Sequence, residues 1–345
     1  MSSLAGHQLG DYVLQEVIDQ GSMGVVYRAV DITTGQPAAV KVLLDALATD
    51  SSFLTRFHQE AGIIAMLQHV NIVRLYTSGL YDGHLYYAME YVDGMTVGKQ
   101  LKTAKRLTPA QVVRVGLQVA DALAYAYSTA QIIHRDIKPD NLMVDVRWNL
   151  KLLDFGLARF EGQGGLTTKG TVVGSLYYVS PEQLLGKPLD GRSDVYALGV
   201  SMYEMLTGTR PHTGKKYEEL SRSILSGSFP PLHHVEPRLP LPLAQVVERA
   251  MASDITQRYQ SSAELWHALK NIEGFMQSSP PSLPTPPPVP SGEQAPPDHR
   301  KGPPSILPGA DISRQGPRSG FLRATTLRPT STNLDDWPSK VDPSE

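Results

Sequence analysis

The spacing of apolar and polar residues changes character near Pro109. Before it, short apolar runs bounded by turn residues predict strands at 12–18, 25–30, 38–43 and 85–91. The segment 51–68 repeats its apolar residues at helical spacing and predicts one helix among these strands. This part of the chain is expected to form a small lobe dominated by strands.

After Pro109 the helical spacing takes over. It predicts helices at 110–130, 194–207, 243–251 and 263–272. We therefore expect an α+β fold with two lobes, a smaller β-rich lobe at about 12–92 and a larger helical lobe at about 93–272. Residues 1–11 are expected to be an N-terminal extension.

The composition shifts sharply near Gln277. More than half of the 27 prolines follow residue 279, in runs such as Pro286-Pro287-Pro288, and apolar periodicity disappears. Such a segment buries too little surface to offset its ordering entropy, so residues 277–345 are predicted to be a disordered, Pro-rich tail. Its stretch 320–337, which contains Phe321 and Trp337, is a candidate docking segment for a partner; a solvated tail is the simpler alternative.

Charge and composition exclude several classes of protein. The 32 basic and 34 acidic side chains nearly cancel, which argues against non-specific nucleic-acid binding. The chain has no cysteine, so disulfides and thiolate chemistry are excluded. No apolar run is long enough to span a bilayer, and the first ten residues lack the features of a signal peptide. We expect a cytoplasmic protein without a membrane span.

A glycine-containing turn connects the first two predicted strands. Gly21, Ser22, Met23 and Gly24 form it, and glycines let backbone N–H groups approach phosphate oxygens closely. Ordinary hairpin chemistry explains two glycines equally well.

A lysine, Lys41, ends the apolar run of the third strand. A buried cation needs a partner, and Glu60 on the following predicted helix is suitable. The alternative is a lysine whose amino group reaches solvent past its apolar neighbours.

The segment 134–141 concentrates polar chemistry. Asp136 can accept a proton, Lys138 can neutralise a phosphoryl group, and Asn141 can bind a metal ion. Two short apolar strands follow and lead to Asp154-Phe155-Gly156, and Asn141 with Asp154 would suit Mg²⁺. The alternative interpretation of the segment 134–141 is an ordinary charged loop at the surface. That interpretation does not explain why two apolar strands follow immediately.

These motifs, in this order, resemble those of the eukaryotic-type (Hanks-type) protein kinases, most closely the bacterial serine/threonine members. The resemblance covers about residues 12–272. It implies the bilobal protein kinase fold and transfer of the γ-phosphoryl group of ATP to hydroxyls of protein substrates, with Mg²⁺ as the metal ion and Mn²⁺ as a second candidate.

The resemblance also implies a role for each motif residue. Asp136 would be the catalytic base, Lys138 the phosphoryl-contacting cation, and Asn141 and Asp154 the metal ligands. Lys41 would hold the phosphates and pair with Glu60, while Gly21, Ser22, Met23 and Gly24 would cover them. The adenine would lie among Ile18, Val26, Ala39 and Met143, bonded to the backbone of Glu90 and Val92 with Met89 behind. Ile64, Leu75, His134 and Phe155 match the family's regulatory spine, anchored by Asp194.

Residues 154–182 resemble an activation loop. Thr167, Thr168 and Thr171 are candidate autophosphorylation sites, and Arg135 is expected to bind the added phosphate. Glu182 is expected to form a buried ion pair with Arg258. Lys138, with Ser175 nearby, favours serine and threonine over tyrosine as acceptors.

The chain departs from the family pattern at a few positions. Asp19 replaces the first glycine of the phosphate loop, Ser180 replaces the usual alanine before Pro181, and Tyr196 replaces a frequent tryptophan. Asp19 supports one alternative, a pseudokinase or scaffold that binds nucleotide without turnover. A small-molecule kinase is a second alternative, but such enzymes lack the extended loop that ends in Ser180-Pro181-Glu182.

Overall fold

The computed structural model describes residues 3–21, 24–44, 51–155 and 174–278; at positions 51–53, 56, 58, 60 and 278 it describes the backbone alone. The first part is a six-stranded antiparallel sheet in the order β1-β2-β3-β4-β6-β5. Its strands are β1 (Gln8–Leu9), β2 (Tyr12–Gly21), β3 (Gly24–Asp31), β4 (Pro37–Leu43), β5 (Leu75–Tyr81) and β6 (His84–Glu90).

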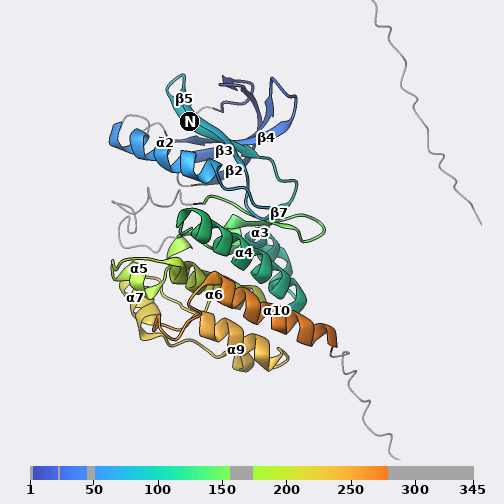
Figure 1. Ribbon diagram of the computed structural model, residues 1–345, viewed down its shortest axis with the longest axis vertical. Helices are drawn as coiled ribbons and strands as arrows, with labels where there is room; N and C mark the ends of the chain where they lie inside the picture. Colours follow the sequence, from blue (N-terminus) through green and yellow to red (C-terminus); the bar gives the residue numbers. More distant parts are fainter. Residues whose placement is uncertain (1–2, 22–23, 45–50, 156–173, 279–345) are drawn as a thin grey trace, which may run out of the picture. The chain divides into compact units, whose positions relative to one another are not determined.

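Helix α2 (Ser51–Ala65) lies beside this sheet (Figure 1). Its Phe57 is fully buried in an apolar cluster with Ala39 and Leu43 of β4 and Tyr87 and Met89 of β6. The register of the sheet places Lys41 of β4 directly opposite Tyr87 of β6. Side chains directly opposite each other on neighbouring strands are close enough to interact. Lys41 and Tyr87 are therefore a cross-strand pair beside α2.

A second, three-stranded sheet joins the two lobes. It consists of β7 (Met95–Thr96), β8 (Leu142–Val144) and β9 (Leu150–Leu152). Directly before β8, the short 3₁₀ helix η1 (Pro139–Asn141) starts with a proline, which suits its first position. Because Leu142 at the start of β8 pairs with Leu152 at the end of β9, Asn141 and Asp154 lie on the same, open end of this β-hairpin.

The remaining secondary-structure elements of the described chain are helices (Figure 1). They are α3 (Val97–Ala104), α4 (Pro109–Ala130), the 3₁₀ helix η3 (Gly174–Tyr178), α5 (Pro181–Leu184), α6 (Gly191–Thr207), α7 (Tyr217–Ser226), α8 (Leu232–Val235), α9 (Leu241–Ala250) and α10 (Ser262–Ser278). Thr108 and Gln111 form a capping box at the start of α4. Helix α6 is buried over most of its length and supplies the rigid centre of this lobe.

The predicted elements are present, with shifted ends and some additions. Helix α2 ends at Ala65 instead of residue 68, and α10 continues to Ser278. The sequence pattern missed β5, which lies at the edge of the sheet and is largely exposed, so it needs no continuous apolar run. It also missed α3 and α7, whose sequences are mostly polar. Among the described residues, every helix is too short or too polar to cross a bilayer.

Candidate active site

A cleft lies between the β-rich sheet and the second sheet. Seven of the residues predicted to surround the adenine line it: Ile18, Val26, Ala39, Met89, Glu90, Val92 and Met143. The two predicted metal ligands, Asn141 and Asp154, line it as well. Sequence reasoning missed Tyr91, Gly94, Thr96, Lys99, Asp140 and Leu153, although Tyr91, Asp140 and Leu153 are direct neighbours of predicted residues in the sequence.

The two glycines of the β2–β3 turn have different structural requirements. Gly21 and Gly24 are opposite each other at the end of the hairpin. A Cβ at Gly24 would lie 2.0 Å from the carbonyl oxygen of Val42, whereas a Cβ at Gly21 would meet open space. Gly24 is therefore required by the close approach of β4, independently of any ligand. Ser22 and Met23 lie outside the described residues.

Lys41, which does not itself line the cleft, pairs with Asp154, which does. The distance from Lys41 Nζ to Asp154 Oδ2 is 2.8 Å, and Tyr87 donates a hydrogen bond of 2.8 Å to Asp154 Oδ1. Burial alone would raise the pKa of Asp154, but the positive charge and hydrogen bond of Lys41 outweigh burial and lower this pKa. Burial and the charge of Asp154 raise the pKa of Tyr87, so its hydroxyl stays protonated and able to donate. The side chain of Glu60, the predicted partner of Lys41, lies outside the described part of the chain.

Toward the helical lobe, a second polar group surrounds Asp136. Lys138 Nζ donates to Asp136 Oδ2 at 2.6 Å and to Ser175 Oγ at 2.7 Å. Asn141 Nδ2 donates to the backbone oxygen of Asp136 at 2.7 Å and to its Oδ2 at 2.9 Å. The structure thus brings together Asp136, Lys138, Asn141 and Ser175, as the sequence predicts.

The backbone of this segment is held in unusual conformations. Arg135 and Asp154 have φ angles of 68° and 54°, in the left-handed region that non-glycine residues seldom adopt. Asp194 of α6 accepts hydrogen bonds from the backbone N–H groups of His134 and Arg135 at 2.7 and 2.9 Å. The N–H of Asp136 donates to His134 Nδ1, so the Nε2 atom carries the proton and donates to the backbone oxygen of Leu153. These contacts connect both strained positions to a buried helix.

The predicted spine residues also come together. The rings of His134 and Phe155 are 4.7 Å apart, and Asp194 anchors the backbone at His134. Phe155, Ile64 and Leu75 line one small cavity next to Tyr87 and Asp154. The spine therefore connects α2, β5 and the segment around Asp154 in the described structure.

At the mouth of the cleft, Asp19 forms an ion pair with Lys99 of α3, with 3.7 Å between Oδ1 and Nζ. Their side chains are 65% and 50% exposed, respectively. No sequence motif indicated Lys99. The carboxylate that replaces the first loop glycine thus has a cation beside it, which reduces its repulsion of an anionic ligand.

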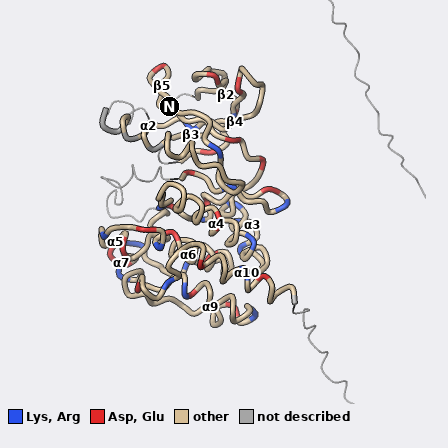
Figure 2. The backbone as a smooth tube through the Cα atoms, in the orientation of Figure 1, with Lys and Arg blue, Asp and Glu red and all other residues tan. Residues whose placement is uncertain are grey.

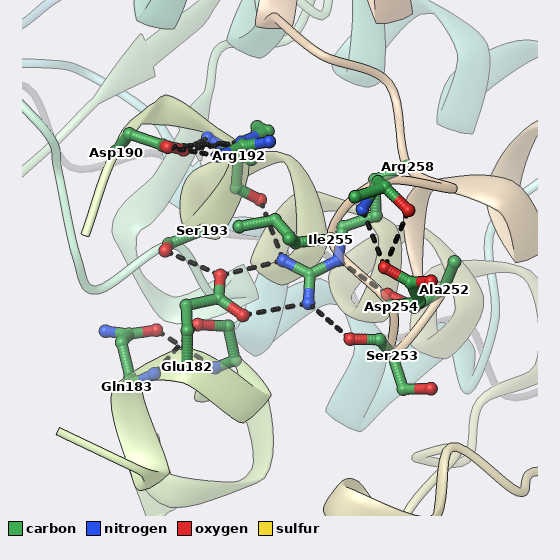
Figure 3. A network of polar contacts seen from close by, with 12 residues as sticks. Glu182, Gln183, Asp190, Arg192, Ser193, Ala252, Ser253, Asp254, Ile255 and Arg258 are labelled. Carbon is green, nitrogen blue, oxygen red and sulfur yellow. Dashed lines mark hydrogen bonds and ion pairs between the residues drawn. The ribbon is translucent and has the colours of Figure 1, made fainter. Parts of the chain in front are cut away.

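Glu182 and Arg258 form the predicted ion pair (Figure 3). Arg258 Nη1 and Nη2 contact Glu182 Oε1 and Oε2 at 2.7 and 2.8 Å, and Ser193 donates to Oε1. Burial would raise the pKa of Glu182, but hydrogen bonds from Arg258 and Ser193 lower it. Ser180, which departs from the family pattern, is the N-cap of α5 and forms a capping box with Gln183.

Thr167, Thr168 and Thr171 lie outside the described residues.

In the described part, acidic and basic side chains are interspersed along both lobes (Figure 2).

Comparison with known proteins agrees with this fold. The sequence profile of the protein kinase domain matches residues 12–269. The chain is 35% identical over 256 residues to the serine/threonine-protein kinase PrkC of Bacillus subtilis, covering 74% of this chain and 39% of that protein. It is 38% identical over 266 residues to the serine/threonine-protein kinase PknB of Mycobacterium tuberculosis, covering 75% of this chain and 42% of that protein. The crystal structure of the Mycobacterium tuberculosis PknI kinase domain matches with a TM-score of 0.62 and 27% identity, over 78% of this chain and 99% of that domain.

The chain therefore belongs to the protein kinase family, in its eukaryotic-type (Hanks-type) branch. It spans about two fifths of the length of the curated relatives that it matches.

The side chains at the cleft fit the nucleotide and metal ion that the family implies. Asn141 uses its Nδ2 atom for Asp136, which leaves its carbonyl oxygen as the atom able to bind a cation. Asp154 supplies a carboxylate kept ionised by Lys41. Two oxygen ligands are few, but Mg²⁺ commonly takes its other ligands from water and substrate phosphates.

Proposed function

We propose that this chain is a serine/threonine protein kinase that transfers the γ-phosphoryl group of ATP, with Mg²⁺ or Mn²⁺, to hydroxyls of protein substrates. The observation that carries the proposal is the arrangement of two polar groups along one cleft. Asp154, which pairs with Lys41, and Asn141, which is bonded to Asp136 beside Lys138, both line this cleft. Phosphoryl transfer needs this combination of cations, metal ligands and a base.

Each residue then has a defined task. Asp136 accepts the proton of the substrate hydroxyl. At the same time the hydroxyl oxygen bonds to the γ-phosphorus, and the bond between the γ-phosphorus and the departing ADP breaks. Lys138 holds the Asp136 carboxylate and provides positive charge for the transferred group. Lys41 binds phosphate oxygens, and Asn141 and Asp154 hold the metal ion, which neutralises phosphate charge when bound.

In a first experiment, the purified protein is incubated with Mg-ATP and a general protein substrate. Phosphoserine and phosphothreonine are then measured by mass spectrometry. Lys41→Met and Asp136→Asn serve as variants. Incorporation in the wild type and its loss in both variants is expected. Nucleotide binding by the wild type without any transfer would instead favour the pseudokinase alternative.

We also propose autophosphorylation at Thr167, Thr168 or Thr171, with the phosphate bound by Arg135. Arg135 directly precedes Asp136, and a doubly charged phosphate suits a guanidinium group. Mass spectrometry of active enzyme tests this, and an unmodified 166–175 segment would contradict it.

In this proposal the kinase domain extends over about 12–272.

The Pro-rich tail, 277–345, is proposed to dock a partner protein through its stretch 320–337. Deletion of 320–337 is then expected to abolish capture of that partner while peptide phosphorylation is retained.

A further inference from the structure

Tyr87 is a buried polar residue to which the proposed mechanism assigns no task. It lies on β6, is 2% exposed, and its hydroxyl donates to Asp154 Oδ1 at 2.8 Å. A buried hydroxyl costs free energy unless it finds a hydrogen-bond partner, and a phenylalanine would fill the same space without this requirement. The contact of the hydroxyl with a predicted metal ligand therefore calls for a functional explanation.

The ring of Tyr87 is fixed from several sides. Register places it opposite Lys41, whose Nζ lies 5.7 Å from the ring centre. The ring also packs against Phe57 of α2, with 6.3 Å between the centroids. A strand position and two packing partners thus define where the hydroxyl lies.

Lys41 and Tyr87 together hold both oxygens of Asp154. Lys41 donates to Oδ2 and Tyr87 to Oδ1, each at 2.8 Å. With both oxygens engaged, the carboxylate plane cannot rotate without breaking one of the two bonds. Lys41 alone would fix a single oxygen through a long, flexible side chain. Asp154 needs such support because its backbone has a φ angle of 54°, in the left-handed region that non-glycine residues seldom adopt.

We propose that Tyr87 is a positioning residue for the metal-binding carboxylate of Asp154. It orients this carboxylate toward the cleft and leaves further lone pairs on the oxygens available to a divalent cation. Hydrogen-bond partners of metal ligands typically contribute a factor of about 10 to 100 in metal affinity. The inference rests on the proposed function, because that function assigns the metal ion to Asn141 and Asp154.

The test measures metal binding directly. Free Mn²⁺ is titrated by electron paramagnetic resonance in the presence of the non-hydrolysable ATP analogue adenylyl imidodiphosphate, for the wild type, Tyr87→Phe and Tyr87→Met. Both variants are expected to bind Mn²⁺ at least about tenfold more weakly. Affinity for the analogue without metal is expected to change by less than about twofold, because the hydroxyl of Tyr87 is bonded to Asp154 and is assigned no contact with the nucleotide. The matched control is Tyr86→Phe, the neighbouring buried tyrosine on β6, which belongs to the apolar cluster on the other face of the sheet.

The outcomes separate this inference from the proposed function. Wild-type Mn²⁺ affinity in Tyr87→Phe, or an equal loss in Tyr86→Phe, overturns the role of Tyr87. Weaker Mn²⁺ binding in the Tyr87 variants supports it even where the wild type transfers no phosphate, in which case only the proposed function fails. A wild type that binds no Mn²⁺ with the analogue overturns both. Raising Mg²⁺ should also restore the kcat of Tyr87→Phe, since only the metal affinity is lowered.

Discussion

The guanidinium group of Arg258 meets the carboxylate of Glu182 in a two-point contact, with distances of 2.7 and 2.8 Å, although 76 positions separate them in the sequence. Arg258 is fully buried, and its remaining donors reach the backbone oxygens of Ala252, Ser253 and Arg192. Its guanidinium also lies 4.9 Å from the centre of the Tyr196 ring. The pair therefore joins α5, at the end of the segment 154–182, to α6 and the segment before α10.

Removal of one partner of this pair should destabilise the helical lobe strongly. Arg258→Met leaves the Glu182 carboxylate buried and without its cation, which typically costs about 3–5 kcal/mol. Urea denaturation is expected to give a free energy of unfolding lower by this amount. The matched control is Lys270→Met, which breaks the exposed pair Lys270–Glu273 and should cause no measurable change. Equal effects of the two substitutions would contradict the assignment.

Lys138 should contribute to the chemical step more than to ATP binding. Its amino group lies between Asp136 and Ser175, at 2.6 and 2.7 Å. Lys138→Met is expected to lower kcat by a factor of about 100 or more while the KM for ATP stays within about threefold, because its charge acts on the transferred group. Steady-state kinetics with a peptide substrate measures both constants.

Ser175→Ala provides a graded comparison, because it removes only one acceptor of the Lys138 amino group. Its decrease in kcat should be clearly smaller than that of Lys138→Met. A rise in the KM for ATP with kcat unchanged, in either variant, would place Lys138 in nucleotide binding instead.

The sequence predicted the cleft better than it predicted the contacts inside it. The family resemblance implied that Val26, Ala39 and Met143 surround the adenine, and all three line the cleft. Tyr87 gave no such signal. It reads as one more apolar residue of β6, and its partner Asp154 is 67 positions away.

The pairing of Asp19 with Lys99 was hidden for the same reason, since it joins two separate elements at the mouth of the cleft. The ion pair of Glu182 with Arg258 was predicted through the family resemblance, and spacing alone would not have indicated it. Long-range polar contacts are therefore the part of the site that sequence reasoning recovers least.

His212 should make the stability of the helical lobe depend on pH. It is 1% exposed, between the hydroxyls of Tyr196 and Ser223 at 3.0 and 3.2 Å, and burial lowers its pKa to about 4. As pH falls below about 6.5, the unfolded chain binds a proton at this histidine while the folded chain does not, so the folded state loses stability. The loss is complete below about pH 4 and amounts to about 3 kcal/mol.

Urea denaturation of the wild type and His212→Asn at pH 7 and pH 4.5 tests this expectation. The variant should lose less stability between the two pH values than the wild type does. His233→Asn, at an exposed histidine, should behave as the wild type. Parallel losses in the wild type and His212→Asn would show that His212 does not titrate in this range.

Asp19 and Lys99 should have opposite effects on nucleotide affinity. Lys99 carries positive charge at the mouth of the cleft, and Asp19, 3.7 Å from it, carries the negative charge that the family's glycine lacks. Because both side chains are at least half exposed, water screens their effect on a triphosphate to about 0.5 kcal/mol per pair of unit charges at about 8 Å. Because a triphosphate carries several charges, Lys99→Ala is expected to weaken ATP binding about threefold to fivefold, and Asp19→Ala to strengthen it by a similar factor. The double variant should bind about as tightly as the wild type, because it removes one charge of each sign.

Fluorescence titration with a labelled ATP analogue at low and high salt measures these differences, which should shrink as salt rises. Lys102→Ala is the matched control, since Lys102 also lies on α3 but does not line the cleft. An effect of Lys102→Ala as large as that of Lys99→Ala would mean that general charge, and not the position of Lys99 beside Asp19, determines the affinity. A fall of more than about a hundredfold in Lys99→Ala would exceed what a screened charge can supply and would require a direct bond from Lys99 to the nucleotide.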